Sequence, residues 1–121
     1  MTYDVEYTDE FEVWWDGLRV DEQESLLTAV DLLEARGPHL EFPFSSGIAT
    51  SRHSHMRELR VQHRGRPYRV LYAFDPLRVG ILLIGGDKTG QKRWYETFVP
   101  VADRLYDEHL QILRMEGSID G

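Results

Sequence analysis

The middle of the chain constrains the fold most, because three strand-like stretches follow one another there with short connections. Residues Met56–Gln62 and Tyr68–Phe74 are rich in strand-forming side chains, and the five residues between them include a glycine and a proline suited to a turn. An Asp-Pro pair then leads into Val79–Ile84, whose last four residues do not alternate between apolar and polar. That lack of alternation is typical of a central strand. The segment therefore predicts an antiparallel meander whose last strand is covered on both faces and ends at Gly85-Gly86.

Helical patterns precede this meander. A short strand over Tyr3–Tyr7 is followed by Thr8, a suitable N-cap for a helix with apolar residues at three- and four-residue spacing. A second helix is predicted from about Asp21 to Gly37-Pro38, since glycine suits the position after a helix and proline cannot continue one. The two consecutive helices predict a helical hairpin. The second helix is expected to bury four apolar residues, namely Leu26, Leu27, Val30 and Leu33.

The remaining segments complete the order of elements. Residues His39–His55 show no sustained period and are predicted to form an ordered loop, and loops of that length are often functional. From about Lys92 to Met115 the spacing predicts a helix that starts or bends at Pro100, because proline lacks the N–H that the helix needs. We therefore predict an α+β protein of order β-α-α-β-β-β-α. In this fold a helical hairpin and a C-terminal helix pack on a small, mainly antiparallel sheet.

Composition is consistent with a single domain over residues 1–121. A content of 41% hydrophobic and 12% aromatic residues is enough for one core. The absence of cysteine excludes disulfides, thiol nucleophiles and thiolate metal sites. The N-terminal segment is acidic, and the longest apolar run falls far short of the roughly 20 residues of a membrane helix. A cytoplasmic protein with no membrane association is therefore expected.

Charges are distributed unevenly along the chain. Ten of the fourteen Lys and Arg residues lie between Arg52 and Arg93 with only three acidic residues, so this stretch carries +7. The other 79 residues contain four basic and eighteen acidic residues and carry −14. Folding does not require such segregation, which favours a basic surface for phosphates and acidic surface elsewhere. The alternative interpretation is that the long cations cover a sheet face and pair with acids of the helices.

The segment Gly85–Lys92 combines glycines and lysines just before a helix. Backbone amides of such a loop attract anions, although the spacing is not that of a Walker A motif. An ordinary strand-to-helix turn is the alternative. Lys88, Lys92 and Arg93 favour an anion site.

Three histidines form a separate candidate site. His53 and His55 would share one face of a strand and, with His63, are candidates for metal binding or acid–base chemistry. No third ligand follows at a suggestive spacing, and few carboxylates lie nearby. We therefore expect neither a metal nor another cofactor, and interpret these residues as solvated loop histidines near RNA or an acidic partner.

Three motifs together resemble a known family. They are Ser51–Arg60 with its Arg-Glu-Leu-Arg, Tyr68–Tyr72, and Leu83–Lys88 followed by Lys92 and Tyr95. In this order they resemble the phage-derived, HigB-like branch of the RelE/ParE toxin superfamily. The resemblance implies a RelE/ParE-like toxin of a type II toxin–antitoxin pair that cuts messenger RNA, commonly on the translating ribosome. It also implies a helix-turn-helix antitoxin as partner, with operator DNA bound only through the toxin–antitoxin complex.

The resemblance further implies which residues act on RNA. Arg69 falls where the family has the third-strand arginine that contacts the scissile phosphate. By position, the catalytic residues are expected to be Arg60, Arg69, Lys88, Lys92 and Tyr95. Further RNA-binding residues are expected to be Arg52, Arg57, Arg64, Arg66 and Arg93. The chain departs from RelE in placing Glu58 inside a strand that is denser in lysine there, and in the long helix that follows Tyr95.

Cleavage needs no metal if the neighbouring 2′-hydroxyl attacks the phosphate. The protein must then orient the nucleotide, relay a proton and stabilise negative charge. We hypothesise that Arg60, Arg69 and Lys88 stabilise that charge and that Lys92 or Tyr95 handles protons. Two alternatives stay open: a ParE-like toxin that inhibits DNA gyrase without catalysis, and an inactive toxin-like protein that still binds its antitoxin. The acidic helices are candidates for antitoxin binding in all three cases.

Overall fold

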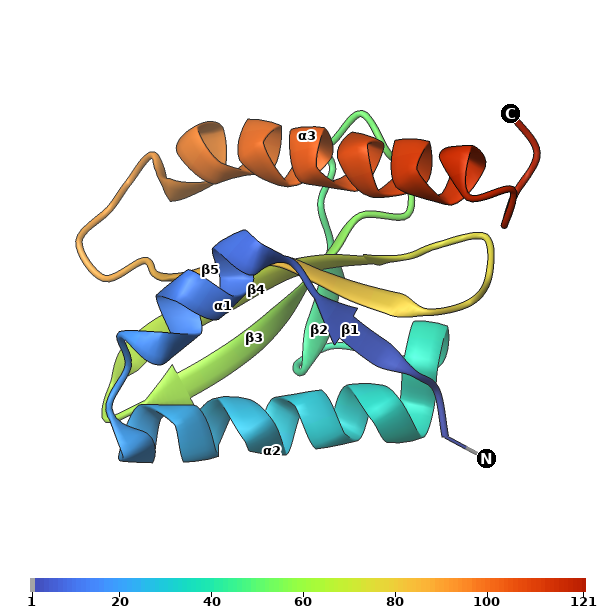
Figure 1. The fold of residues 1–121 in the computed structure, drawn as a ribbon. Coiled ribbons are helices and arrows are strands. Elements are labelled where there is room, and N and C mark those ends of the chain that lie inside the picture. Colours follow the sequence, from blue (N-terminus) through green and yellow to red (C-terminus); the bar gives the residue numbers. More distant parts are fainter. Residues whose placement is uncertain (1) are drawn as a thin grey trace.

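The computed structural model describes residues 2–121 and shows three α-helices around one five-stranded sheet (Figure 1). The strands are β1 (Val5–Tyr7), β2 (Ser45–Gly47), β3 (Arg57–His63), β4 (Arg66–Phe74) and β5 (Gly80–Asp87). The helices are α1 (Asp9–Asp16), α2 (Val20–Arg36) and α3 (Trp94–Met115), with a 3₁₀ turn at Gly37–His39. The predicted α+β class is confirmed, and the order of elements differs from the prediction only by the additional strand β2.

The sheet has the strand order β1-β5-β4-β3-β2. Strands β3, β4 and β5 form the predicted antiparallel meander, whereas β1 pairs in parallel with β5 at one edge. At the other edge β2 pairs antiparallel with β3, inside the segment predicted to be a loop. Its sequence, Ser-Ser-Gly, carries no strand signal, so its extended conformation depends on pairing with β3.

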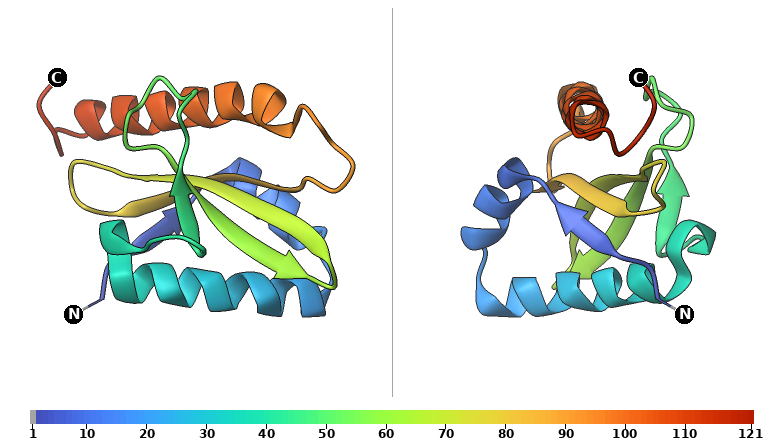
Figure 2. Two further views of the ribbon diagram at one scale, coloured as in Figure 1. Left: turned by 180° about the vertical axis from the view of Figure 1, so that it is seen from behind. Right: turned by 45° about the vertical axis from the view of Figure 1, so that its right-hand side comes forward.

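Helices cover both faces of the sheet. In Figure 2, α2 lies below the sheet and α3 above it. Leu82 of β5 belongs to the core cluster under α1 and α2, whereas its neighbour Leu83 belongs to the cluster under α3. The prediction that the last strand is covered on both faces is therefore confirmed.

The prediction that Gly85-Gly86 ends the last strand is wrong. Strand β5 runs through both glycines to Asp87. The rings of Trp14 on α1 and Trp94 on α3 occupy the space that side chains at these positions would need, and a Cβ on Gly86 would lie 2.6 Å from Trp94 Nε1. The glycines thus allow one helix to approach each face closely.

The helix boundaries agree largely with the sequence. Thr8 caps α1, accepting a hydrogen bond from the Phe11 amide at 3.0 Å. Helix α3 begins at Trp94 and contains Pro100, so Pro100 does not start the helix. Leu27 was expected to be buried but is 47% exposed, because it lines an open cavity between α1 and α2. None of the helices within residues 2–121 combines the length and apolar composition needed to cross a bilayer.

Candidate active site

Strand register places two arginines and a glutamate on the face of the sheet that α3 covers. Glu58 and Arg60 lie two residues apart on β3 and therefore share a face. Arg60 is the register partner of Arg69 on β4. Leu71, opposite Glu58, belongs to the core cluster under α3, which identifies the face.

Glu58 is at the centre of this group. Its Oε1 accepts a hydrogen bond from the Tyr95 hydroxyl at 2.6 Å and lies 3.3 Å from Arg69 Nε. Its Oε2 accepts a hydrogen bond from Ser46 Oγ at 2.7 Å and lies 3.5 Å from Arg60 Nη1. Each carboxylate oxygen is thus held by one hydroxyl and one guanidinium. With the lysine described next, the Glu58 cluster consists of Glu58, Arg60, Arg69, Lys88 and Tyr95.

The end of β5 and the first turn of α3 complete the Glu58 cluster. Lys88 directly follows β5, and Tyr95 is the second residue of α3. Lys88 Nζ donates a hydrogen bond to the Tyr95 hydroxyl at 3.4 Å and lies 4.8 Å from the centre of its ring. The Tyr95 hydroxyl therefore links the lysine to the Glu58 carboxylate.

The cluster has a buried floor and a more accessible rim. Arg69 and Glu58 are only 4% and 5% exposed, whereas the Arg60 side chain is 29% exposed. Lys88 and Tyr95 are half-buried. Arg69 Nη1 donates to the Tyr68 carbonyl at 2.9 Å, while its buried Nε makes no hydrogen bond within residues 2–121. An approaching anion therefore meets the rim first and the Arg69 charge beneath it.

Burial and neighbouring charge shift the pKa values of two members of the cluster. Burial lowers the pKa of Lys88, and the nearby charge of Arg69 lowers it further. Burial raises the pKa of the Tyr95 phenol, and its hydrogen bond to Glu58 raises it further. Tyr95 thus remains a proton donor at neutral pH, while Lys88 releases a proton more readily than a solvated lysine. The lowered pKa of Lys88 suits a group that gives up a proton, whereas the raised pKa of Tyr95 keeps its phenol protonated.

Four of the ten predicted catalytic and RNA-binding residues meet in the Glu58 cluster, and six do not. Arg57 extends from the opposite face of β3, where its Nε donates to Ser45 Oγ at 3.0 Å. Lys92 is exposed on the loop before α3. The other four form ion pairs with local carboxylates: Arg52 with Asp107, Arg64 with Asp21, Arg66 with Asp87, and Arg93 with Glu96. The alternative interpretation, in which long cations pair with acids, thus describes this last group.

The segment Gly85–Lys92 is partly strand, and several of the backbone amides expected to bind an anion are occupied. Gly85 and Gly86 belong to β5. The backbone amides of the following turn are already used by protein acceptors, at Lys88, Thr89 and Gln91. The segment contributes to the site through the Lys88 side chain instead.

The histidines lie elsewhere and contact α2 and α3 rather than solvent alone. His53 Nε2 lies 2.8 Å from Asp107 Oδ1, and His55 Nε2 lies 3.0 Å from the Tyr106 hydroxyl. The side chains of His53 and His63 are 19% and 10% exposed, so the interpretation of these two as solvated loop residues is wrong. Burial lowers the pKa of His55, and the charge of His53 adds to the effect.

Glu58 is the functional candidate that sequence reasoning missed. It was noted only as a departure from the lysine-rich strand of RelE, yet it contacts both arginines and the tyrosine of the cluster. The available signal was the Arg-Glu-Leu-Arg sequence, in which Glu58 and Arg60 share a strand face.

Comparisons with known proteins identify a family and a fold. The family model described as "Phage derived protein Gp49-like (DUF891)" matches residues 13–107. The Mycobacterium tuberculosis protein named "Putative toxin HigB2" is 39% identical over 111 residues, which cover 90% of this chain but only 54% of that protein. "Putative toxin HigB3" of the same organism is 44% identical over 100 residues, covering 82% of this chain and 86% of that protein. This chain therefore spans about half the length of the first relative and most of the second.

Two solved structures share the fold. A chain of the archaeal RelE–RelB complex from Pyrococcus horikoshii has a TM-score of 0.54 and 21% identity, over 73% of this chain and 97% of that one. A double-arginine mutant of E. coli RelE in the free state has a TM-score of 0.57 and 15% identity, over 79% of this chain and 94% of that one. At these identities the likeness concerns the fold alone, and it confirms the expected RelE-like architecture.

Proposed function

This chain belongs to the phage-derived Gp49-like family, and on that basis we propose that it is the toxin of a type II toxin–antitoxin pair and cleaves messenger RNA. The names of its two M. tuberculosis relatives support the toxin assignment. One structural observation carries the proposed cleavage. Arg60, Arg69, Lys88 and Tyr95, which lie on two strands, a loop and a helix, meet around the carboxylate of Glu58.

The rim of the Glu58 cluster is suited to a phosphodiester. Arg60 and Lys88 present positive charge at the accessible side, and a guanidinium can hold two phosphate oxygens at once. Arg69 adds positive charge from below, where the low dielectric strengthens it. These cations stabilise the charge that develops on the phosphorane during cleavage.

The Tyr95–Glu58 hydrogen bond provides a path for the proton. As the ribose 2′-hydroxyl attacks phosphorus, the Tyr95 oxygen takes its proton and passes the phenol proton to Glu58 Oε1, 2.6 Å away. The bond from phosphorus to the 5′-oxygen breaks, and Lys88 protonates that oxygen. The products are a 2′,3′-cyclic phosphate and a 5′-hydroxyl. In this scheme Tyr95 keeps the proton-handling role that the sequence suggested for Lys92 or Tyr95, and Glu58 is the group that accepts the proton from it.

Arginines outside the cluster suit contacts to a larger RNA. Arg64 and Arg66 lie at the β3–β4 hairpin with side chains that are 73% and 55% exposed. Exposed cations of this kind bind the phosphate backbone without reading sequence. We therefore propose that the substrate is messenger RNA on the translating ribosome in the cytoplasm. A helix-turn-helix antitoxin would neutralise the toxin and connect it to operator DNA.

Induction of the chain followed by pulse labelling tests the proposed function. RNA cleavage predicts that protein synthesis falls early and that transcripts acquire new 5′-hydroxyl ends. Early DNA damage with intact transcripts would instead support a ParE-like gyrase inhibitor. No growth arrest at all would support an inactive protein.

Arg60→Ala and Arg104→Ala form a matched pair for this experiment. Both remove one arginine charge, but Arg104 is exposed on α3 and, within residues 2–121, forms an ion pair with Glu108 alone. The Arg60 variant is expected to lose growth arrest, while the Arg104 variant retains it. Equal growth arrest in both variants would refute the role of the cluster.

A further inference from the structure

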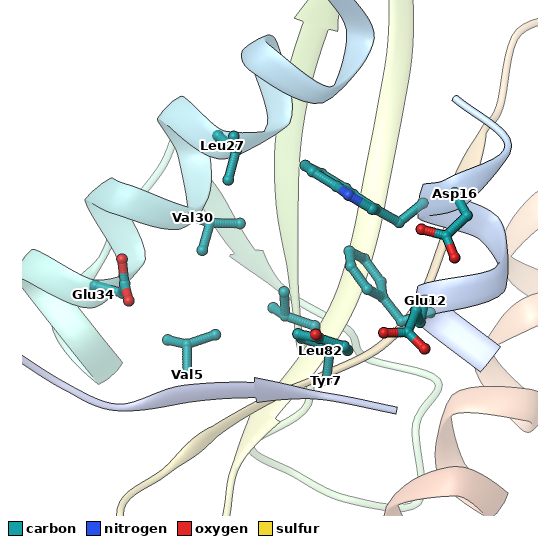
Figure 3. Close-up of a pocket in the computed structure, with 10 residues that line it drawn as sticks. Val5, Tyr7, Glu12, Asp16, Leu27, Val30, Glu34 and Leu82 are labelled. Carbon is teal, nitrogen blue, oxygen red and sulfur yellow. The ribbon is translucent and has the colours of Figure 1, made fainter. Parts of the chain in front are cut away.

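An open apolar cavity lies between α1 and α2, beside strands β1 and β5, whereas the arginines and the glutamate of the Glu58 cluster lie on β3 and β4. Its volume is about 330 Å³, and Val5 and Leu82 form part of its floor beside β1. Figure 3 shows Leu27 and Val30 projecting from α2 toward this space. Tyr7 is 58% exposed and Leu27 is 47% exposed. The α1–α2 groove therefore keeps large apolar groups in contact with water.

Acidic side chains surround this groove. Glu12 and Asp16 of α1 lie on one side, and Glu34 of α2 lies on the other (Figure 3). A second cavity of about 310 Å³ shares Tyr7 with the groove, on the side of β1 toward α3. Four more carboxylates line it, at Glu6, Asp9, Glu10 and Glu108. Of the described residues that line the two cavities, none is a lysine or arginine.

The charge of these cavities decides which kind of partner they accept. Glu108 forms an ion pair with Arg104, but the other six carboxylates form no ion pair within residues 2–121. Their charge repels the phosphates of RNA, so this edge of the sheet is unsuited to the substrate. Apolar groups surrounded by charge of one sign instead favour a protein segment with apolar anchors and basic flanks. Residues two helical turns apart, such as Leu27 and Glu34, allow one segment to engage both an anchor and a charge.

We propose that the α1–α2 groove and the adjoining cavity bind a basic amphipathic segment of the antitoxin. This inference rests on the proposed function, which supplies the antitoxin as partner. The groove lies beside β1 on the α1–α2 face, whereas the Glu58 cluster lies on β3, β4 and the start of α3 on the other face. Changes in the groove are therefore expected to leave RNA cleavage intact.

Charge reversal on α2 tests the inference. Glu34→Lys places a cation in the groove, whereas Glu24→Lys makes the same change at an exposed position of α2 that lines neither cavity. The probe is the purified antitoxin encoded beside this chain, with affinity measured by isothermal titration calorimetry at low and high salt. We expect Glu34→Lys to weaken binding by at least about tenfold at low salt and Glu24→Lys to change it less than about threefold.

A growth assay separates the inference from the proposed function. The Glu34→Lys chain should still arrest growth, and coexpressed antitoxin should no longer relieve the arrest. If Glu34→Lys weakens antitoxin binding but the wild-type chain never arrests growth, the docking site stands and the proposed toxin activity fails. If growth arrest occurs but Glu34→Lys and Glu24→Lys both bind the antitoxin as tightly as the wild-type chain does, the docking site is refuted and the proposed function stands.

Leu27→Asp provides an independent test of the apolar anchor, because its partly exposed side chain is not required for the core. It is expected to weaken antitoxin binding without changing the growth arrest. A wild-type dimer that Leu27→Asp dissociates would assign the groove to a second copy of the chain and overturn the proposal. Failure of the wild-type chain to bind the antitoxin would overturn it as well.

Discussion

Replacing Glu58 by alanine is expected to destabilise the protein by about 3–5 kcal/mol, because it leaves Arg69 charged and unpaired in the interior. Arg69 is only 4% exposed, and within residues 2–121 the one hydrogen bond of its side chain goes to the Tyr68 carbonyl, so Glu58 supplies its only nearby countercharge there. A loss of this size is a large part of the roughly 5–15 kcal/mol by which a domain is usually stable. The substitution is therefore expected to lower the urea midpoint strongly.

The opposite substitution should cost less. Without Arg69, the Glu58 carboxylate still accepts hydrogen bonds from Tyr95 and Ser46 and still lies near Arg60, which is partly exposed. Arg69→Ala is therefore expected to cost about 1–3 kcal/mol, since fewer groups lose their partners. The double variant should cost clearly less than the sum of the single variants, because neither charge is then left alone.

Urea unfolding followed by tryptophan fluorescence measures these differences. Trp94 is suited to report on the site because it is buried and precedes Tyr95. Glu24→Ala, at an exposed position of α2, serves as the control and should change stability by less than about 0.5 kcal/mol. A Glu58→Ala variant as stable as this control would refute the buried ion pair. Strict additivity in the double variant would do the same.

Three further outcomes follow from the contacts described. Gly86→Ala should destabilise the protein by about 1–3 kcal/mol in urea unfolding, because Trp94 fills the space that a Cβ would need. Gly17→Ala is the control and should be tolerated, because the nearest atom to a Cβ there is 3.6 Å away. Because the pKa of His55 is lowered in the folded protein, the unfolded chain protonates this imidazole more readily, and the free energy of unfolding should fall as the pH drops below the usual histidine pKa of 6.5. The His55→Gln variant should therefore lose less stability than the wild type between pH 7 and pH 5. Tyr95→Phe should slow RNA cleavage by about 100-fold or more, because it removes the proton path to Glu58, and a change below tenfold would contradict that role.

The main elements could be predicted because each has a local cause. The N-cap at Thr8, the unbroken apolar run in β5 and the turn residues between β3 and β4 all act within a few positions. By contrast, β2 and the continuation of β5 through Gly85-Gly86 depend on distant partners. Pairing with β3 fixes β2, and two tryptophan rings from different helices explain the glycines.

The candidate site could be predicted only in part, for the same reason. Charge and motif order indicated Arg60, Arg69, Lys88 and Tyr95, but charge alone could not separate them from arginines that pair locally. Only the register of β3 with β4, together with the position of α3, shows that Glu58 joins the four. From the sequence Glu58 is only a departure from the lysine-rich strand of RelE, whereas its contacts in the fold make it the residue that connects the others.

The central claim is that the Glu58 cluster cleaves RNA, and one reconstituted reaction tests it most directly. Purified chain is added to ribosomes translating a defined messenger RNA, and the new 5′ ends are mapped by primer extension and tested for a 5′-hydroxyl. The wild-type chain is expected to cleave the messenger RNA, a folded Arg69→Ala variant to cleave it about 100-fold more slowly, and Arg104→Ala to cleave it at the wild-type rate. Absence of cleavage by the wild-type chain, or equal rates for Arg69→Ala and the wild type, would contradict the account.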